Sequence, residues 1–175
     1  MSQPAERVEP PSVGRDFTPE EFRAVMGRFI TGVTVVTLQA PDGPHGTTVN
    51  SFSSVSLDPP MVLICLRRGA RTAHALEYSG HFAVNILAQH QQSLGRLFAT
   101  RSRPSGSAAF AHIAHRTGVT GVPLLDGSVA HIECVSAGRL RAGDHTIFMG
   151  EVVAVAAHED IGPLAFHRGK FLAVS

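Results

Sequence analysis

The most informative segment of this chain is Gly46-Thr-Thr-Val-Asn-Ser-Phe-Ser-Ser-Val-Ser-Leu-Asp-Pro-Pro60. The segment is predicted to be a strand, but it is unusually rich in hydroxyl and amide side chains. Only Val49 and Val55 are aliphatic before Leu57. A half-buried strand normally alternates apolar and polar residues. Short side chains leave backbone N–H groups accessible, which favours an acceptor-rich ligand such as a phosphate or a heterocycle with carbonyl edges. A solvent-exposed edge strand or a Ser/Thr loop is an equally open alternative.

Length and composition predict one domain with a sizeable core, because 43% of the 175 residues are hydrophobic. The net charge of +1, from 15 basic and 14 acidic residues, argues against a surface for nucleic acid or an acidic membrane. We therefore expect small molecules or other proteins as partners. The sequence shows no apolar N-terminal export signal and no apolar run of about 20 residues, so a cytoplasmic protein is the simplest expectation.

The histidines and cysteines predict no metal site. The ten histidines are scattered, and the one suggestive pair, His112 and His115, would face opposite sides of a strand. Cys65 and Cys134 lie in apolar runs without a CxxC spacing. This pattern predicts buried reduced thiols rather than a disulfide framework.

The N-terminal region predicts a tail and then a helix. Residues 1–16 combine charged residues and prolines with few aliphatic side chains, which is typical of a disordered or loosely docked tail, so the domain is expected to span 17–175. Thr18-Pro-Glu-Glu21 predicts a helix start with an N-cap, proline at the first helical position and a capping box. The helix should run to about Ile30 and stop at Gly32. Its expected buried stripe consists of Phe22, Val25, Met26 and Phe29.

The remaining chain predicts mostly strands. Branched residues at 33–38 and the turn residues at 40–45 predict a hairpin with the polar strand. Met61 to Leu66 should be a strand buried on both faces. Further strands are expected at 81–87, 128–140 and 146–156, helices at 72–78 and 89–98, a mobile lid-like loop at 99–109, and a short crossover plus last strand within 163–174. Six or more strands with few helices imply a closed or nearly closed antiparallel barrel.

A basic cluster precedes the helix expected at 72–78. Arg67, Arg68 and Arg71 stand beside its start, where unpaired N–H groups and the helix dipole would add to the guanidinium charge. The cluster predicts an anion site. A solvated basic turn has equal support from the spacing.

Seven short motifs, taken in order, resemble the flavin reductase family of FMN-binding split barrels, the NAD(P)H:flavin partners of two-component monooxygenases. The resemblance covers about Phe17 to Val174. Its motifs are Phe29-Ile-Thr-Gly-Val-Thr-Val-Val-Thr37, Gly46 to Pro60, Arg71-Thr72, Phe82-Ala-Val-Asn-Ile-Leu87, Pro123-Leu-Leu-Asp-Gly127, Gly143-Asp-His-Thr-Ile-Phe-Met-Gly-Glu-Val152 and Phe166-His-Arg-Gly-Lys-Phe171.

The resemblance implies a mainly β fold, an antiparallel split β-barrel of Greek-key type with a few peripheral helices. It also implies FMN or FAD as the flavin, NADH or NADPH as hydride donor, a homodimer, and a separate oxygenase that receives reduced flavin by diffusion. Residues implied to line the flavin are Thr47, Thr48, Val49, Asn50, Ser51, Ser53 and Ser54. Residues implied to hold its phosphate are Ala70, Arg71 and Thr72.

Two of these positions carry particular consequences. Many relatives have Ser where this chain has Ala70, so one phosphate contact is missing and the preference between FMN and FAD stays open. His145, in the Gly-Asp-His turn, matches the position where nicotinamide docks near the flavin, and is the candidate catalytic residue. The alternative for His145 is a purely structural role in the hairpin.

Hydride transfer between two cofactors needs no protein nucleophile, and the sequence contains no nucleophile elbow and no GxGxxG after a strand. Backbone N–H groups of 50–54 are candidates to stabilise the reduced flavin. Two other classes stay open: a flavin-dependent oxidase of the pyridoxamine-phosphate-oxidase type, and a non-enzymatic flavin or haem carrier. The motifs at 143–145 and 166–169 favour the reductase.

Overall fold

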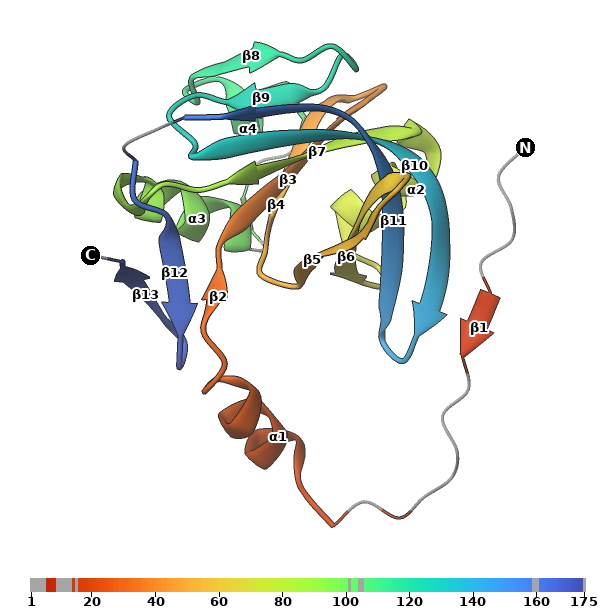
Figure 1. The fold of residues 1–175 in the computed structure, drawn as a ribbon, viewed down its shortest axis with the longest axis vertical. Helices are drawn as coiled ribbons and strands as arrows, with labels where there is room; N and C mark the ends of the chain where they lie inside the picture. Colours follow the sequence, from red (N-terminus) through yellow and green to blue (C-terminus); the bar gives the residue numbers. More distant parts are fainter. Residues whose placement is uncertain are drawn as a thin grey trace.

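The computed structural model describes residues 6–8, 14, 16–100, 102–103, 106–158 and 161–174. Its largest sheet follows one antiparallel path (Figure 1). In the order of hydrogen bonding the strands are β4 (Gly43–Val49), β3 (Thr34–Ala40), β7 (His81–Ile86), β10 (Ala130–Ala142), β11 (His145–Ala157), β6 (Pro60–Arg67) and β5 (Phe52–Leu57).

The two ends of this path are consecutive strands. β4 and β5 are joined only by Asn50 and Ser51, so the sheet must curl to bring its ends together. The backbone N–H of Cys65 on β6 donates to the carbonyl of Ser51 at 3.1 Å, at the point where the ends meet. The predicted mainly β, antiparallel split barrel is confirmed.

Shorter elements surround this barrel. β1 (Glu6–Val8) pairs in parallel with β10, β2 (Thr31–Gly32) pairs with β12, and β8 (His115–Thr117) pairs with β9 (Pro123–Leu125). The helices are α1 (Pro19–Met26), α2 (Arg71–Ser79), the 3₁₀ turn η1 (Gln89–Gln91), α3 (Gln92–Ala99) and α4 (Ser107–Phe110).

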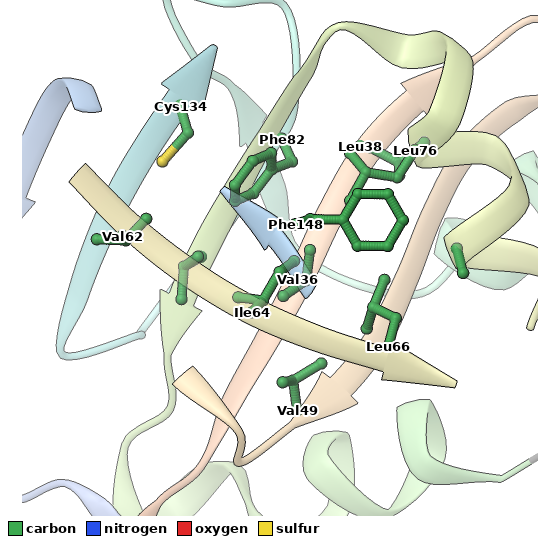
Figure 2. Packing of buried hydrophobic residues seen from close by; sticks show 12 residues of the cluster. Val36, Leu38, Val49, Val62, Ile64, Leu66, Leu76, Phe82, Cys134 and Phe148 are labelled. Carbon is green, nitrogen blue, oxygen red and sulfur yellow. The ribbon is translucent and has the colours of Figure 1, made fainter. Parts of the chain in front are cut away.

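The barrel interior is an apolar core. Figure 2 shows Phe148 among Leu38, Leu76, Ile64 and Leu66, all of which are buried. The prediction that Met61 to Leu66 is buried on both faces is wrong: Val62, Ile64 and Leu66 are buried, whereas the alternate residues are only half-buried. One face of β6 lines the core, and its other face is only partly covered within one chain.

The predicted hairpin between 33–38 and the polar strand is confirmed as β3 and β4, with a shorter turn than predicted. The predicted hairpin of 128–140 and 146–156 is confirmed as β10 and β11, with Gly143 and Asp144 forming the turn. The crossover predicted within 163–174 is wrong. β12 (Leu164–His167) and β13 (Lys170–Ala173) form a hairpin instead. Arg168 and Gly169 take φ values of 49° and 78°, as a tight turn between twisted strands requires. The helix predicted at 89–98 is divided into η1 and α3.

The helix α1 begins as predicted but ends early. The Thr18 hydroxyl accepts from the backbone N–H of Glu21, whose carboxylate accepts in return from the backbone N–H of Thr18. The helix ends at Met26 and is capped by Gly27 rather than Gly32.

The predicted buried stripe of α1 is wrong within one chain. Phe22, Val25, Met26 and Phe29 are 52–68% exposed, because the helix lies apart from the sheets (Figure 1). Helical spacing identified an apolar face, but spacing does not show what covers it.

Two predicted segments lie partly outside the described residues. Of the expected tail 1–16, the structure describes only 6–8, 14 and 16, and the backbone of 6–8 pairs with β10. Of the expected mobile loop 99–109, it leaves out 101, 104 and 105 and places α4 at the end.

Candidate active site

A cavity of about 540 Å³ opens where the ends of the sheet meet. Its wall consists of Thr47–Ser51 at the β4–β5 junction, Cys65–Arg71 from β6 to the start of α2, and the single residues Ala99, Arg103 and His145. Segments far apart in the sequence thus surround one volume. Most of the wall is polar or basic, which suits an anionic, hydrogen-bonding ligand.

Most of the predicted site residues lie on this wall. They are Thr47, Thr48, Val49, Asn50, Ser51, Ala70, Arg71 and His145. Thr72 lies just behind the wall: it is buried, and its hydroxyl accepts from Arg103 Nη2 at 3.4 Å. Ser53 and Ser54 are not brought to the cavity. They are exposed on β5, where the Ser53 hydroxyl donates to the Ser54 carbonyl at 3.0 Å.

The polar stretch is an interrupted strand. β4 ends at Val49 and β5 begins at Phe52, which leaves the short Asn50–Ser51 link beside the cavity. The Thr48 hydroxyl donates to the Gly95 carbonyl of α3 at 2.7 Å, and the Ser51 hydroxyl donates to the Cys65 carbonyl at 3.0 Å. These two side chains hold the junction against α3 and β6, and so fix the shape of the wall.

One part of the wall is built for an anion. α2 starts at Arg71, one residue earlier than predicted, and its N-cap is Ala70, which offers the first turn no side-chain acceptor. The first-turn N–H groups and the helix dipole therefore favour a negative group there. The side chains of Arg67, Arg68 and Arg71 add positive charge to the same stretch of wall.

Arg103 is the functional candidate that sequence reasoning missed. Its Nη2 and Nε donate to the Gly46 carbonyl at 2.7 and 3.1 Å, and its own carbonyl accepts from Arg71 Nη2 at 2.8 Å. Burial, together with the nearby charge of Arg71, lowers the pKa of Arg103. The residue lies in the segment interpreted as a mobile loop, and nothing local signals that it reaches β4.

His145 is the first residue of β11 and pairs with Arg67 of β6. Its Nδ1 donates to the Asp144 carboxylate at 2.8 Å, and the Asp144 carbonyl accepts from the Arg68 N–H at 2.9 Å. The hydrogen bond with His145, and then the charge of that ring, lower the pKa of Asp144. With Nδ1 bonded to Asp144, Nε2 is the ring nitrogen left for a ligand. The ring is 46% exposed on the cavity wall.

The two cysteines are free, as predicted. Burial raises the pKa of Cys134 to about 12, with a further contribution from Glu133, so this thiol stays protonated. Burial also raises the pKa of Cys65 on the cavity wall, against a smaller opposing effect of Ser51. Neither sulfur is a nucleophile here.

Comparison with known families supplies the deciding observation. The model of the flavin reductase like domain matches residues 26–175, which is most of the chain. The chain belongs to the flavin reductase family. The motifs from Gly46 to His145 all lie within the matched residues.

Curated and solved relatives agree. The chain is 44% identical over 150 residues to the FMN reductase (NADH) SmoA of Agrobacterium fabrum, covering 86% of this chain and 83% of that protein. It is 38% identical over 156 residues to HsaB of Rhodococcus jostii, the reductase subunit of a flavin-dependent monooxygenase, covering 89% and 78%. The solved structure of the NADH:FAD oxidoreductase SgcE6 of Streptomyces globisporus superposes with a TM-score of 0.85 at 39% identity, covering 95% of this flavin reductase and 99% of that chain.

The cavity fits a flavin nucleotide. The uncapped start of α2 and the arginines suit its phosphate, and the short side chains of Thr47 to Ser51 leave backbone groups open to a polar ring. Within the described residues, no group of three His, Cys, Asp or Glu side chains could hold a metal ion. Among the same residues, the structure contains no helix with the length and apolar character needed to cross a membrane.

Proposed function

We propose that this flavin reductase oxidises NADH or NADPH, reduces FMN or FAD in the 540 Å³ cavity, and releases the reduced flavin to a separate oxygenase. One observation carries the proposal: the fold gathers the Thr47–Ser51 junction, the start of α2 and His145 around a single volume. The names of the relatives support it, since they include an NADH-dependent FMN reductase and a monooxygenase reductase subunit. An oxidase or a non-enzymatic carrier has no comparable support.

The chain's own residues bind and orient the ligands. Arg71 and the first turn of α2 would hold the flavin phosphate, with Arg103 fixing Arg71 through its carbonyl. Backbone N–H groups of Asn50 and Ser51 are the candidate donors toward the ring, because Ser53 and Ser54 lie away from the cavity. When bound, the flavin supplies the redox chemistry, accepting two electrons and a proton equivalent from the nicotinamide.

His145 would position the nicotinamide. Asp144 would hold the ring of His145 through Nδ1 and leave Nε2 to contact the nicotinamide. A fixed orientation of two reacting rings is worth several orders of magnitude in effective concentration. No protein group has to be consumed or transiently modified in this scheme.

The direct test is oxidation of NADH and NADPH by the purified protein with FMN, with FAD and with no added flavin. We expect oxidation that depends on added flavin. Background rates in every combination, despite flavin binding, would exclude the reductase. Oxygen consumption without nicotinamide would indicate the oxidase.

The role of His145 has its own test. His145→Ala should lower kcat/KM for NADH by roughly tenfold or more through lost orientation, with an unchanged Kd for flavin. Asp144→Asn should have a smaller effect in the same direction. If His145 matters only for the hairpin, His145→Ala will lower the thermal stability and leave the kinetics of the folded enzyme unchanged.

We also propose a homodimer. The structured helix α1 has eight residues and buries none of them, although short isolated helices are marginal in water. The exposed apolar side chains of Phe22, Val25 and Met26 therefore need a partner surface, and a second copy supplies the same surface by symmetry. We also expect the protein in the cytoplasm, because reduced nicotinamide nucleotides are produced there.

A further inference from the structure

A second cavity, of about 660 Å³, shares Arg71 with the first. One side of its wall is a single face of α2, formed by Arg71, His74, Ala75 and Tyr78 at positions i, i+3, i+4 and i+7. The other side is formed by the end of β3, the turn residues Pro41 and Asp42, and His45 of β4. The cavity therefore begins where the proposed flavin phosphate would end.

Its α2 side is an aromatic platform. Tyr78 is 76% exposed, an unusual position for a tyrosine on an otherwise half-buried helix. The His74 ring meets it edge to face, with 5.3 Å between the ring centroids and 77° between the planes. An exposed aromatic pair beside the apolar side chain of Ala75 suits a planar heterocycle, because a base can stack there at little cost in side-chain entropy.

The opposite side carries an oriented carboxylate. Asp42 Oδ1 accepts from His45 Nε2 at 2.8 Å, and His45 is only 8% exposed, so the carboxylate is held by a side chain that is itself fixed in the fold. Its remaining acceptor capacity suits ribose hydroxyls or the exocyclic amine of a base. Acidic side chains hold ribose hydroxyls in the same way in other dinucleotide sites.

We propose that this second cavity binds the adenosine of FAD, with adenine against Tyr78 and ribose near Asp42. The inference rests on the proposed flavin site in the first cavity. Along α2, Arg71 and Tyr78 are two turns apart, about 10 Å, so a chain that continues from a phosphate at Arg71 reaches the platform without crossing bulk solvent. FMN ends at Arg71 and leaves the second cavity to water. The enzyme should therefore bind FAD more tightly than FMN, even though Ala70 offers the phosphate no hydroxyl.

The test is equilibrium binding of oxidised FAD and FMN, followed by flavin fluorescence, with no nicotinamide present. Tyr78→Ala should weaken FAD binding by roughly tenfold, the value of one base on an aromatic ring, and leave FMN binding unchanged. Tyr78→Phe is the matched control, because it keeps the ring and should retain the FAD affinity. Since Tyr78 is exposed, both variants should keep the wild-type melting temperature.

Three outcomes would overturn the inference. If Tyr78→Ala weakens FAD and FMN binding equally, the effect lies at the phosphate rather than at the adenine. If Tyr78→Ala leaves FAD binding unchanged, Tyr78 does not contact the adenine. In a separate steady-state assay at saturating FMN, an increased KM for NADH in Tyr78→Ala, with unchanged FAD binding, would assign the cavity to the adenosine of the nicotinamide dinucleotide. The binding measurement uses oxidised flavin only, so its result can be interpreted even if the reductase assay fails. If the wild type binds neither flavin, the inference and the proposed function fall together.

Discussion

Arg71 and Arg103 bring two positive side chains to one part of the cavity. Arg71 donates to the Arg103 carbonyl, and the charge of Arg71 is one cause of the lowered pKa of Arg103. Two like charges held close together repel each other, and a bound anion relieves that repulsion. A phosphate bound at this part of the wall would interact with both positive side chains.

Replacement of Arg71 tests this arrangement. Arg71→Ala should raise the Kd for FMN by roughly tenfold to a hundredfold, because a charge-assisted hydrogen bond to phosphate is lost. Arg71→Lys should recover part of the affinity. The comparison variant is Arg116→Ala, whose side chain pairs with Asp126 away from both cavities. Isothermal titration with FMN measures all three, and equal Kd values for Arg71→Ala and wild type would remove Arg71 from the phosphate site.

At the residue scale, features set by neighbouring residues in the sequence could be predicted, and contacts between distant residues could not. The Arg-Thr pair at 71–72 signalled a helix start from adjacent residues, and α2 starts one residue before the predicted Thr72. The contact of Arg103 with Gly46 joins residues 57 apart in sequence. No spacing rule links such a pair, because the barrel closure that brings them together is set by the whole sheet.

At the scale of elements, β4 and α3 pack so closely that glycine is required at one point. A Cβ on Gly46 would run into the Phe98 ring, which is buried in the second core cluster. The same glycine presents its carbonyl to Arg103. The packing of β4 against α3 therefore also fixes the position of Arg103 on the cavity wall.

Gly46→Ala should destabilise the protein by about 1–3 kcal/mol through overpacking. It should also weaken flavin binding, because β4 carries Thr47 and Thr48. Gly32→Ala is the matched control, since a Cβ there meets no described atom within 4 Å, and its effect should stay within about 0.5 kcal/mol. Urea unfolding measures both. Equal stabilities of the two variants would show that α3 moves aside freely.

A buried carboxylate anchors the segment before β9. Glu133 of β10 is only 5% exposed and accepts from the Thr120 hydroxyl at 2.6 Å, the Thr120 N–H at 2.8 Å and the Val119 N–H at 3.2 Å. Burial by itself would raise the pKa of Glu133, but these hydrogen bonds outweigh burial and leave the pKa below 4.5. The ionised form is therefore the one that the fold stabilises.

The expected consequence is a pH-dependent stability. A lowered pKa in the folded state stabilises the protein above the unfolded value of 4.5, and the stabilisation is lost as the pH falls through the folded value. Glu133→Gln should cost about 2 kcal/mol near neutral pH and less in acid. Urea unfolding at about pH 7 and about pH 3.5 measures the difference, with the exposed Glu151→Gln as control. A constant difference between Glu133→Gln and wild type would contradict the assignment.

Among the elements, too, features set by adjacent residues were predictable, and features set by packing were not. The capping box at Thr18 and the turn at Gly143–Asp144 were predictable because a few adjacent residues determine them. The burial of α1 and the two-faced burial of β6 were not, since both depend on what packs against the element. The hairpin at 164–173 was missed because its turn uses Arg168, a non-glycine residue at positive φ.

At the scale of the whole molecule, several large apolar side chains remain exposed on the surface of one chain. Beyond α1, the exposed large apolar side chains include Val153 and Val155 on β11 and Leu57 at the end of β5. Exposed large apolar side chains on several elements of one chain favour a partner surface that covers some of them.

Disruption of α1 is the test of this assembly. Replacing Phe22 and Met26 together with serine should convert a dimer of about twice 18.6 kDa into monomers, because the apolar face would no longer exclude water. Val119→Ser is the control, since Val119 is exposed but lies in the segment held by Glu133, far along the chain from α1. Light scattering coupled to gel filtration measures the masses. A wild-type protein that is monomeric and fully active at every concentration would show that α1 is covered by something other than a second copy.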